Sequence, residues 1–260
     1  MPVTVTELAI APVKGMRLMA VDELELTEYG PLGDRAFMVV EPDGKLVNTM
    51  RTPELMQVEP RFDPASGELA LRFPGGDEAV AMPGGEPAST KLYNGREVTG
   101  RLLAGPPSDA LSTHLGRDVR LLALDHAQTG ADDFPVTLRS TASLTALGAA
   151  LGDSVPDARR FRMTIAVDGL GAWEEHGWAG SEIAVGEVGL RVTDPVPRCA
   201  VTTRDPENGR TDLPVLRALA ELRGKDDVTF GVWCAVTRPG HVSRGDAVTA
   251  DAPPSSARGH

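Results

Sequence analysis

The pattern that most constrains this chain is a series of short apolar runs in which apolar and polar residues alternate. Between residue 3 and about residue 124 these runs are VTELAIAPV, VDELELTEYG, RAFMVVEPDGKLV, GELALRF, EVTGRLLAG and VRLLAL. A period of two is typical of strands that bury one face. The chain also has 28 glycines and 21 prolines, which punctuate the runs. The sequence therefore predicts many short strands joined by tight turns.

Helical spacing is confined to a few segments. Apolar residues and helix-start or helix-stop residues predict helices over 108–115, 140–151 and 213–224. Strand composition returns after each of them. We therefore predict an α+β fold that is mainly β, with a closed or nearly closed barrel, because closure removes exposed strand edges.

A polar, turn-rich segment, DHAQTGADDFP, interrupts the strand pattern at 125–135. It is the predicted boundary between one domain at 1–124 and a second at 125–251. The segment APPSSARGH at 252–260 has the composition of a disordered tail.

The charge balance excludes some classes of partner. With 26 basic and 37 acidic residues the net charge is −11, which argues against a nucleic-acid-binding surface. No apolar run approaches the roughly 20 residues that a membrane span needs, and the N-terminus lacks the pattern of a signal peptide. These features predict a cytoplasmic protein that binds neither nucleic acid nor membrane.

The two cysteines differ in context. Cys199 follows Arg198 in the stiff segment VTDPVPRCAVTTRDPENG, whereas Cys234 lies in the apolar run VTFGVWCAVT. A neighbouring cation favours the thiolate, which serves as a nucleophile or as a ligand for a soft metal. The alternative for either residue is a small buried side chain, which we expect for Cys234. Two cysteines are too few for an iron–sulfur cluster.

Basic residues gather near predicted turns despite the acidic total. They are Lys14, Arg17, Arg35, Arg51, Arg139, Arg159, Arg160 and Arg162. Folded around one cavity, several of them would bind an anion, because guanidinium groups fit phosphate oxygens. The alternative is solvated surface charge paired with the abundant carboxylates.

The segment PRCAVTTRDPENG, followed by a helix, the strand FGVWCAV and the segment GHVSRGDAV, resembles the signature of MOSC domains, named for the C-terminal domain of molybdenum cofactor sulfurase. Upstream, APVKGMRLMAVDELELTEYGPLGDRAFMVVEPDGKLVNTMRTPEL resembles the β-barrel domain that precedes MOSC in the branch containing the amidoxime-reducing components. The resemblance covers about 1–250. It implies an N-terminal MOSC β-barrel domain at 1–124 and a MOSC domain that binds molybdenum cofactor at 125–251.

The resemblance also assigns roles. It makes Cys199 the protein ligand of molybdenum, and it makes Lys14 and Arg35 the residues that hold the cofactor phosphate. Arg162 becomes a further cofactor contact through the match of Phe161-Arg162 to a Phe-Arg-Pro-Asn segment. Met163 and Thr164 depart from that pattern, so that the Thr164 hydroxyl replaces an amide contact.

Further contacts are implied by neighbouring segments. Ser140 and Thr141, at the start of STASL, are expected to line the pterin, where helix N–H groups favour ring carbonyls or phosphate oxygens. Arg198 and Thr202 flank the metal ligand as cofactor contacts. Asp205 is assigned a catalytic role in orienting the threonines or the metal loop. Thr137 stands where a histidine is common in the family.

The implied function is a molybdenum cofactor-dependent oxidoreductase that reduces N-hydroxylated compounds with electrons from a separate flavin or iron–sulfur donor protein. The acidic net charge favours a basic docking face on that donor. The alternative is a sulfur or molybdenum cofactor carrier that uses a Cys199 persulfide without turnover. Pyridoxal phosphate is not expected, because the aminotransferase-like domain that binds it in the sulfurase has no counterpart in this sequence.

Overall fold

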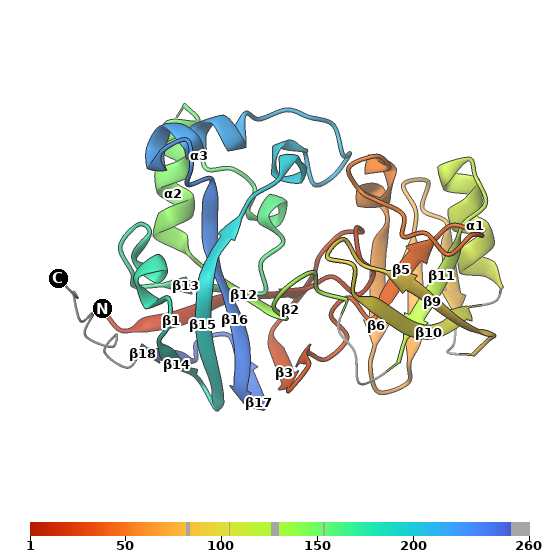
Figure 1. The fold of residues 1–260 in the computed structure, drawn as a ribbon, viewed down its shortest axis with the longest axis horizontal. Coiled ribbons are helices and arrows are strands. Elements are labelled where there is room, and N and C mark those ends of the chain that lie inside the picture. The colour runs from red at the N-terminus through yellow and green to blue at the C-terminus, as the bar shows by residue number, and fades with distance from the viewer. Residues whose placement is uncertain (82–83, 104, 126–129, 153, 251–260) are drawn as a thin grey trace.

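A computed structural model describes the chain except for residues 82–83, 104, 126–129, 153 and 251–260. The predicted tail at 252–260 lies outside the described residues. A larger body built around a barrel adjoins a smaller body of β-strands with one helix, and the barrel carries two helices on one side (Figure 1). The prediction of a mainly β, α+β fold with a closed barrel is confirmed.

Seven strands form the barrel, in the order β13-β12-β16-β15-β14-β18-β1, and pairing of β13 with β1 closes it. Their bounds are β1 Val3–Ile10, β12 Val136–Ser140, β13 Ile165–Asp168, β14 Glu182–Val185, β15 Val188–Pro197, β16 Thr229–Arg238 and β18 Ala247–Ala250. β12 and β13 are parallel, and the other barrel pairs are antiparallel. The short strand β2, Met19–Val21, extends the sheet along β1.

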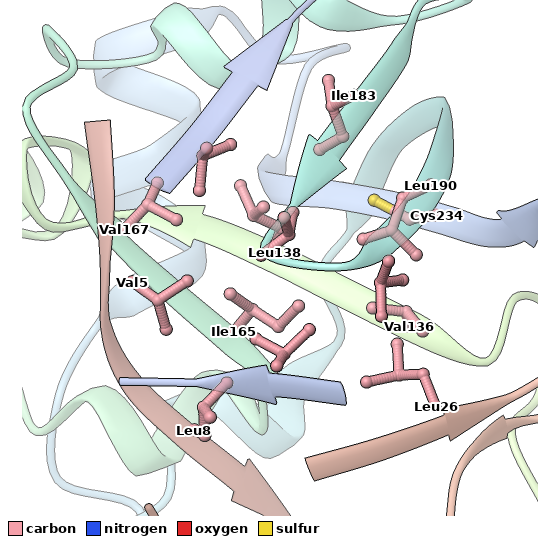
Figure 2. Close-up of a cluster of buried hydrophobic side chains, with 14 of the residues drawn as sticks. Val5, Leu8, Leu26, Val136, Leu138, Ile165, Val167, Ile183, Leu190 and Cys234 are labelled. Carbon is pink, nitrogen blue, oxygen red and sulfur yellow. The ribbon is translucent and has the colours of Figure 1, made fainter. Parts of the chain in front are cut away.

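Branched aliphatic side chains from alternate strand positions fill the barrel (Figure 2). Val5, Leu138, Ile165 and Leu190 are among those buried there. Cys234 points into the same core, fully buried, and this burial raises the pKa of its thiol to about 12. The expectation that Cys234 is a core residue is confirmed.

The first strand of the chain completes the barrel of the C-terminal half. In β1, Thr4 pairs with Asp168 and Leu8 with Ile165. Alternation in the sequence predicts the strand but not the sheet that it joins, because the pairing partner lies far along the chain. The division of the chain into domains at 1–124 and 125–251 stays a prediction.

The smaller body contains two antiparallel sheets and helix α1, Pro106–Leu115. One sheet has β5 Phe37–Val40, β11 Arg120–Leu124, β10 Glu97–Leu103 and β9 Pro87–Lys91; the other has β6 Glu59–Asp63, β7 Glu68–Arg72 and β8 Glu78–Ala81. Leu55, Leu69 and Leu121 are fully buried in their shared core. A third sheet, of β17 Gly240–Ser243, β3 Glu23–Thr27 and β4 Gly30–Pro31, joins chain segments of both halves.

Helices α2, Thr141–Ala150, and α3, Val215–Arg223, cover one side of the barrel (Figure 1). Ser140 caps α2 by accepting a hydrogen bond from the Ala142 N–H at 3.1 Å. Four 3₁₀ helices are described: η1 Pro53–Gln57, η2 Ala158–Phe161, η3 Glu174–Trp178 and η4 Ala200–Thr203. Within the described ranges, no helix has both the length and the apolar character needed to cross a bilayer.

Candidate functional site

A cavity of about 600 Å³ is lined by residues of both bodies. We call it the cationic cavity. It brings together six of the predicted site residues, Lys14, Arg35, Arg162, Arg198, Cys199 and Thr202. These residues come from widely separated parts of the sequence, so their convergence is a property of the fold.

Cys199 lies where β15 ends and η4 begins, and its side chain is exposed. Thr202 closes this turn, because its backbone N–H and its hydroxyl both donate to the Cys199 carbonyl, at 3.1 and 3.0 Å. The turn therefore holds the thiol at the cavity wall while Thr202 itself is buried.

Arg198 lies under Cys199 with no carboxylate partner among its described contacts. Its Nε and Nη2 donate to the Phe230 carbonyl and its Nη1 donates to the Phe161 carbonyl at 3.0 Å. The guanidinium also stands 5.7 Å from the ring centre of Phe161. Burial lowers the pKa of Arg198 to about 9.

Lys14 and Arg35 both have anionic partners. Lys14 Nζ donates to the Gly130 carbonyl and to Asp132 Oδ1, each at 2.9 Å, and burial lowers the pKa of Lys14. Arg35 pairs with the adjacent carboxylate of Asp34, whose Oδ1 accepts the Ala11 N–H at 2.7 Å. These contacts fix both cations at the cavity wall.

Arg162 differs from the other cations of the cavity in its hydrogen bonding. Its Nη2 is buried and donates to no acceptor among the described residues. Burial, followed by repulsion from Arg35, lowers the pKa of Arg162 to about 10. A buried donor normally has a partner, so the cavity fits a ligand with anionic oxygens.

Several other basic residues of the predicted set form ion pairs instead. Arg139 pairs with Glu7, Arg160 with Asp212, and Arg17 and Arg159 with Glu207. Arg17 and Arg159 thus match the interpretation as paired surface charge. Arg139 and Arg160 are paired but buried, and Arg160 lines the cationic cavity.

Ser140 and Thr141 do not line the cationic cavity. The anion at the start of α2 is the buried carboxylate of Glu175, which accepts from the Ser140 N–H at 3.3 Å and from the Ser143 hydroxyl at 2.8 Å. Burial raises the pKa of Glu175. The Thr141 hydroxyl donates to Asp168 at 2.6 Å. The Ser140 N–H and the Thr141 hydroxyl, which we expected to contact a pterin, therefore bind carboxylates of the protein itself.

Thr164 and Asp205 also serve internal contacts. Thr164 is buried, and its hydroxyl lies 3.2 Å from that of Thr137, which does line the cavity. Asp205 Oδ1 accepts from the N–H groups of Glu207 and Asn208, at 2.8 and 3.0 Å. Asp205 therefore shapes the turn that follows η4 and makes no described hydrogen bond to the threonines.

Several residues that line the cationic cavity had no predicted role. They are Asn48, Thr49, Tyr93, Asp132, Phe134 and Trp233. Asn48 and Thr49 lie inside the upstream segment that carried the family resemblance, so that segment held a signal. Asp132 and Phe134 lie in the segment 125–135, which we predicted to be a domain boundary. Its polar, turn-rich composition is equally typical of a linker and of a loop that lines a site.

The donor set fits a metal that brings most of its own ligands. Among the described residues, no group of three or more His, Cys, Asp or Glu side chains could hold a metal ion. The cationic cavity instead offers one soft donor, Cys199, together with Arg162, whose buried Nη2 has no acceptor among the described residues. One thiolate with cationic side chains suits a metal complex whose other ligands carry negative charge.

The fold and this cavity define a MOSC protein. Residues 125–249 match the model of the MOSC domain, and residues 2–103 match the model of the MOSC N-terminal beta barrel domain. The chain belongs to the MOSC family.

Individual relatives agree with this assignment. The chain is 29% identical to mitochondrial amidoxime reducing component 2 of Bos taurus over 94% of this chain and 82% of that protein. It is 25% identical to molybdenum cofactor sulfurase of Homo sapiens, over 89% of this chain but only 30% of the sulfurase. The crystal structure of the YUAD protein from Bacillus subtilis shares the fold, with a TM-score of 0.50, 13% identity and coverage of 96% of both chains.

Proposed function

We propose that this protein is a molybdenum cofactor-dependent oxidoreductase that reduces N-hydroxylated compounds. The observation that carries the proposal is the exposed thiol of Cys199 in a cavity where Nη2 of Arg162 is buried without a hydrogen-bond acceptor among the described residues. The names of the relatives, amidoxime-reducing component above all, supply the substrate class.

Each cavity residue has a proposed part. Cys199 would ligate molybdenum through its exposed sulfur. Lys14, Arg35 and Arg162 would hold the cofactor phosphate, with Arg162 gaining the acceptor that it lacks in the protein alone. Thr202 keeps the metal loop in its turn.

When bound, the cofactor would supply a two-electron centre that accepts the oxygen of an N-hydroxyl group. The chain would position the substrate beside it. Trp233 and Phe134 line the cavity with ring centres 6.1 Å apart, and Tyr93 lies at the same cavity. These rings offer apolar contact to the body of an organic substrate.

A separate flavin or iron–sulfur protein would deliver the electrons. Asp132 and the exposed Asp133 lie at the cavity, and the chain carries a net charge of −11. A donor with a basic face would dock near this rim, and its association would slow as salt screens the attraction. Equal donor-dependent rates at low and high ionic strength would contradict this part of the proposal.

Turnover of benzamidoxime tests the function. Protein from a host that makes the cofactor is supplied with chemically reduced methyl viologen, and benzamidine is quantified by chromatography. The wild type should form benzamidine, and Cys199→Ser should not. Asp118→Asn is the matched control, because it removes an exposed carboxylate that does not line the cationic cavity, and it should keep most of the activity. Molybdenum-loaded wild type that forms no product would contradict the proposal.

A further inference from the structure

A second cavity, of about 870 Å³, has the opposite electrostatic character to the cationic cavity. We call it the acidic cavity. It lies between the β3-β4 hairpin, the ends of β11 and β16, and the β6-β7 turn. None of the proposed cofactor contacts lines it.

The walls of the acidic cavity are largely apolar. Leu26 and Phe37 are buried in its wall, and Phe37 packs edge-on against Phe62 with ring centres 5.0 Å apart. Tyr29 and Leu32 also line the cavity and are 43% and 39% exposed, respectively, although both side chains are large and apolar. Exposed apolar side chains around a cavity are typical of a surface that binds a ligand.

The charged residues that line the cavity are all carboxylates. They are Glu25, Glu28, Asp34 and Asp125. The described lining includes no lysine or arginine, and its two other titratable side chains are the exposed rings of Tyr29 and His241. Asp34 is already used by Arg35 and the Ala11 N–H. Glu25, Glu28 and Asp125 are exposed, and Asp125 Oδ2 also accepts a hydrogen bond from the Thr99 hydroxyl at 2.6 Å.

We propose that the acidic cavity binds a small organic cation with a flat apolar body, of the aryl-alkyl ammonium class. The three exposed carboxylates would attract the ammonium group. The rings of Tyr29 and Phe62 would contact the aryl body, and an aromatic face also attracts a cation. Charge complementarity excludes an anion, since no described lining residue supplies a fixed positive charge.

The site shares a wall with the cationic cavity. Residues 29–34 line the acidic cavity, and the next residue, Arg35, lines the cationic one. Two backbone hydrogen bonds hold this segment: the Leu32 N–H donates to the Glu25 carbonyl at 2.8 Å, and the Arg35 N–H donates to the Ala11 carbonyl at 2.7 Å. A ligand in the acidic cavity would therefore contact residues 29–34, which directly precede Arg35 in the wall of the cationic cavity.

Titration calorimetry with 2-phenylethylammonium tests the proposal on protein prepared without cofactor. The neutral 2-phenylethanol and the anionic 3-phenylpropionate are matched probes. The ammonium should bind at least about 10-fold more tightly than the alcohol, and the carboxylate should not bind, since each nearby charge contributes on the order of a few-fold in affinity. Equal affinity for ammonium and alcohol, or no binding of the ammonium, would overturn the proposal.

Variants locate the binding. The triple variant Glu25→Gln, Glu28→Gln, Asp125→Asn should weaken ammonium binding about 10-fold or more, and Leu32→Arg should do the same by placing a cation at the rim. Asp118→Asn removes an exposed carboxylate outside the cavity and should leave affinity unchanged. Circular dichroism checks that each variant is folded.

Cys199→Ala separates this proposal from the proposed function. Its affinity for the ammonium should equal that of the wild type, whatever the outcome of the turnover assay. Affinity that depends on Cys199 would place the ligand in the cationic cavity and overturn the proposal.

Discussion

Arg162 and Arg35 line the same cavity and repel each other, but only Arg35 has a carboxylate partner among the described residues, the adjacent Asp34. Nη2 of Arg162 is buried without a hydrogen-bond acceptor there. An unpaired buried charge destabilises a fold unless a ligand compensates it. Arg162 therefore lowers the stability of the cofactor-free protein and raises the affinity of the cavity for an anion.

Replacing Arg162 separates these two effects. In cofactor-free protein, Arg162→Gln should raise the free energy of unfolding by about 1–3 kcal/mol, because the unsatisfied buried charge is removed. The same variant should retain less cofactor when made in a cofactor-producing host. Urea unfolding and molybdenum analysis measure the two quantities. Arg159→Gln changes an exposed, paired arginine and is the control; a cofactor-free Arg162→Gln less stable than wild type would contradict the account.

The two thiols should differ in reactivity. Cys199 is exposed beside a cation, whereas Cys234 is buried with a pKa raised to about 12. Iodoacetamide at neutral pH should therefore label one thiol of the native cofactor-free protein, and peptide mass spectrometry should assign it to Cys199. Cys234 should react only after denaturation. Equal labelling of both residues in native protein would refute this difference.

His176 should make stability depend on pH. Burial, with repulsion from Arg223, lowers its pKa from 6.5 to about 4. Between these values the unfolded chain binds a proton that the folded chain does not, so stability falls as the pH drops from 6.5 toward 4. The two ring nitrogens are buried, but the residue as a whole is only partly buried, so we expect this contribution to be about 1 kcal/mol at pH 5.

The variant His176→Phe should remove that part of the acid sensitivity. Urea unfolding at pH 7.5 and at pH 5 gives the loss of stability for each protein, and the wild type should lose about 1 kcal/mol more than the variant. An equal loss in both would show that His176 is not held neutral in the fold.

Gly209 links the metal loop to the smaller body. It adopts a φ of +75°, and a Cβ there would stand 2.5 Å from the Pro53 carbonyl oxygen. Beside it, Gln57 donates to the Asn208 carbonyl at 3.2 Å. Gly209→Ala should therefore loosen the loop, cost about 1 kcal/mol or more, and lower molybdenum retention although Cys199 is intact.

Hydrogen exchange measures the loosening directly. Backbone amides of residues 205–209 should exchange faster in Gly209→Ala than in wild type. Gly224→Ala is the control: its φ of +107° is also positive, but a Cβ would meet nothing within 4 Å. Unchanged exchange at 205–209 in Gly209→Ala would mean that the contact with Pro53 does not hold the loop.

Local patterns predicted the strands, helix α2 with its Ser140 cap, and the burial of Cys234, because each depends on neighbouring residues. The pairing of strands that lie far apart in the sequence cannot be predicted from such local patterns. The alternation in Val3–Ile10 predicts a strand, but nothing in it shows that this strand closes the barrel against β13. The prediction that Lys14 and Arg35 share a site with Cys199 came from the family resemblance and not from their spacing in the sequence.

Some predicted cofactor contacts make internal hydrogen bonds to residues distant in the sequence. Ser140 and Thr141 have suitable groups for a ligand, but Glu175 and Asp168 occupy them. Thr164 likewise faces Thr137. A donor in the sequence does not reveal which acceptor the fold brings to it. The unpartnered Nη2 of Arg162 is visible only once the cavity is formed.

Molybdenum per monomer is the most direct test of the central claim that Cys199 ligates the metal of a bound cofactor. Wild type, Cys199→Ala and Asp118→Asn are purified from a host shown to load another molybdoenzyme, and metal is measured by mass spectrometry. We expect near-stoichiometric molybdenum in the wild type and in Asp118→Asn, and a sharp loss in Cys199→Ala. Wild type without molybdenum, or Cys199→Ala with as much metal as wild type, would contradict it.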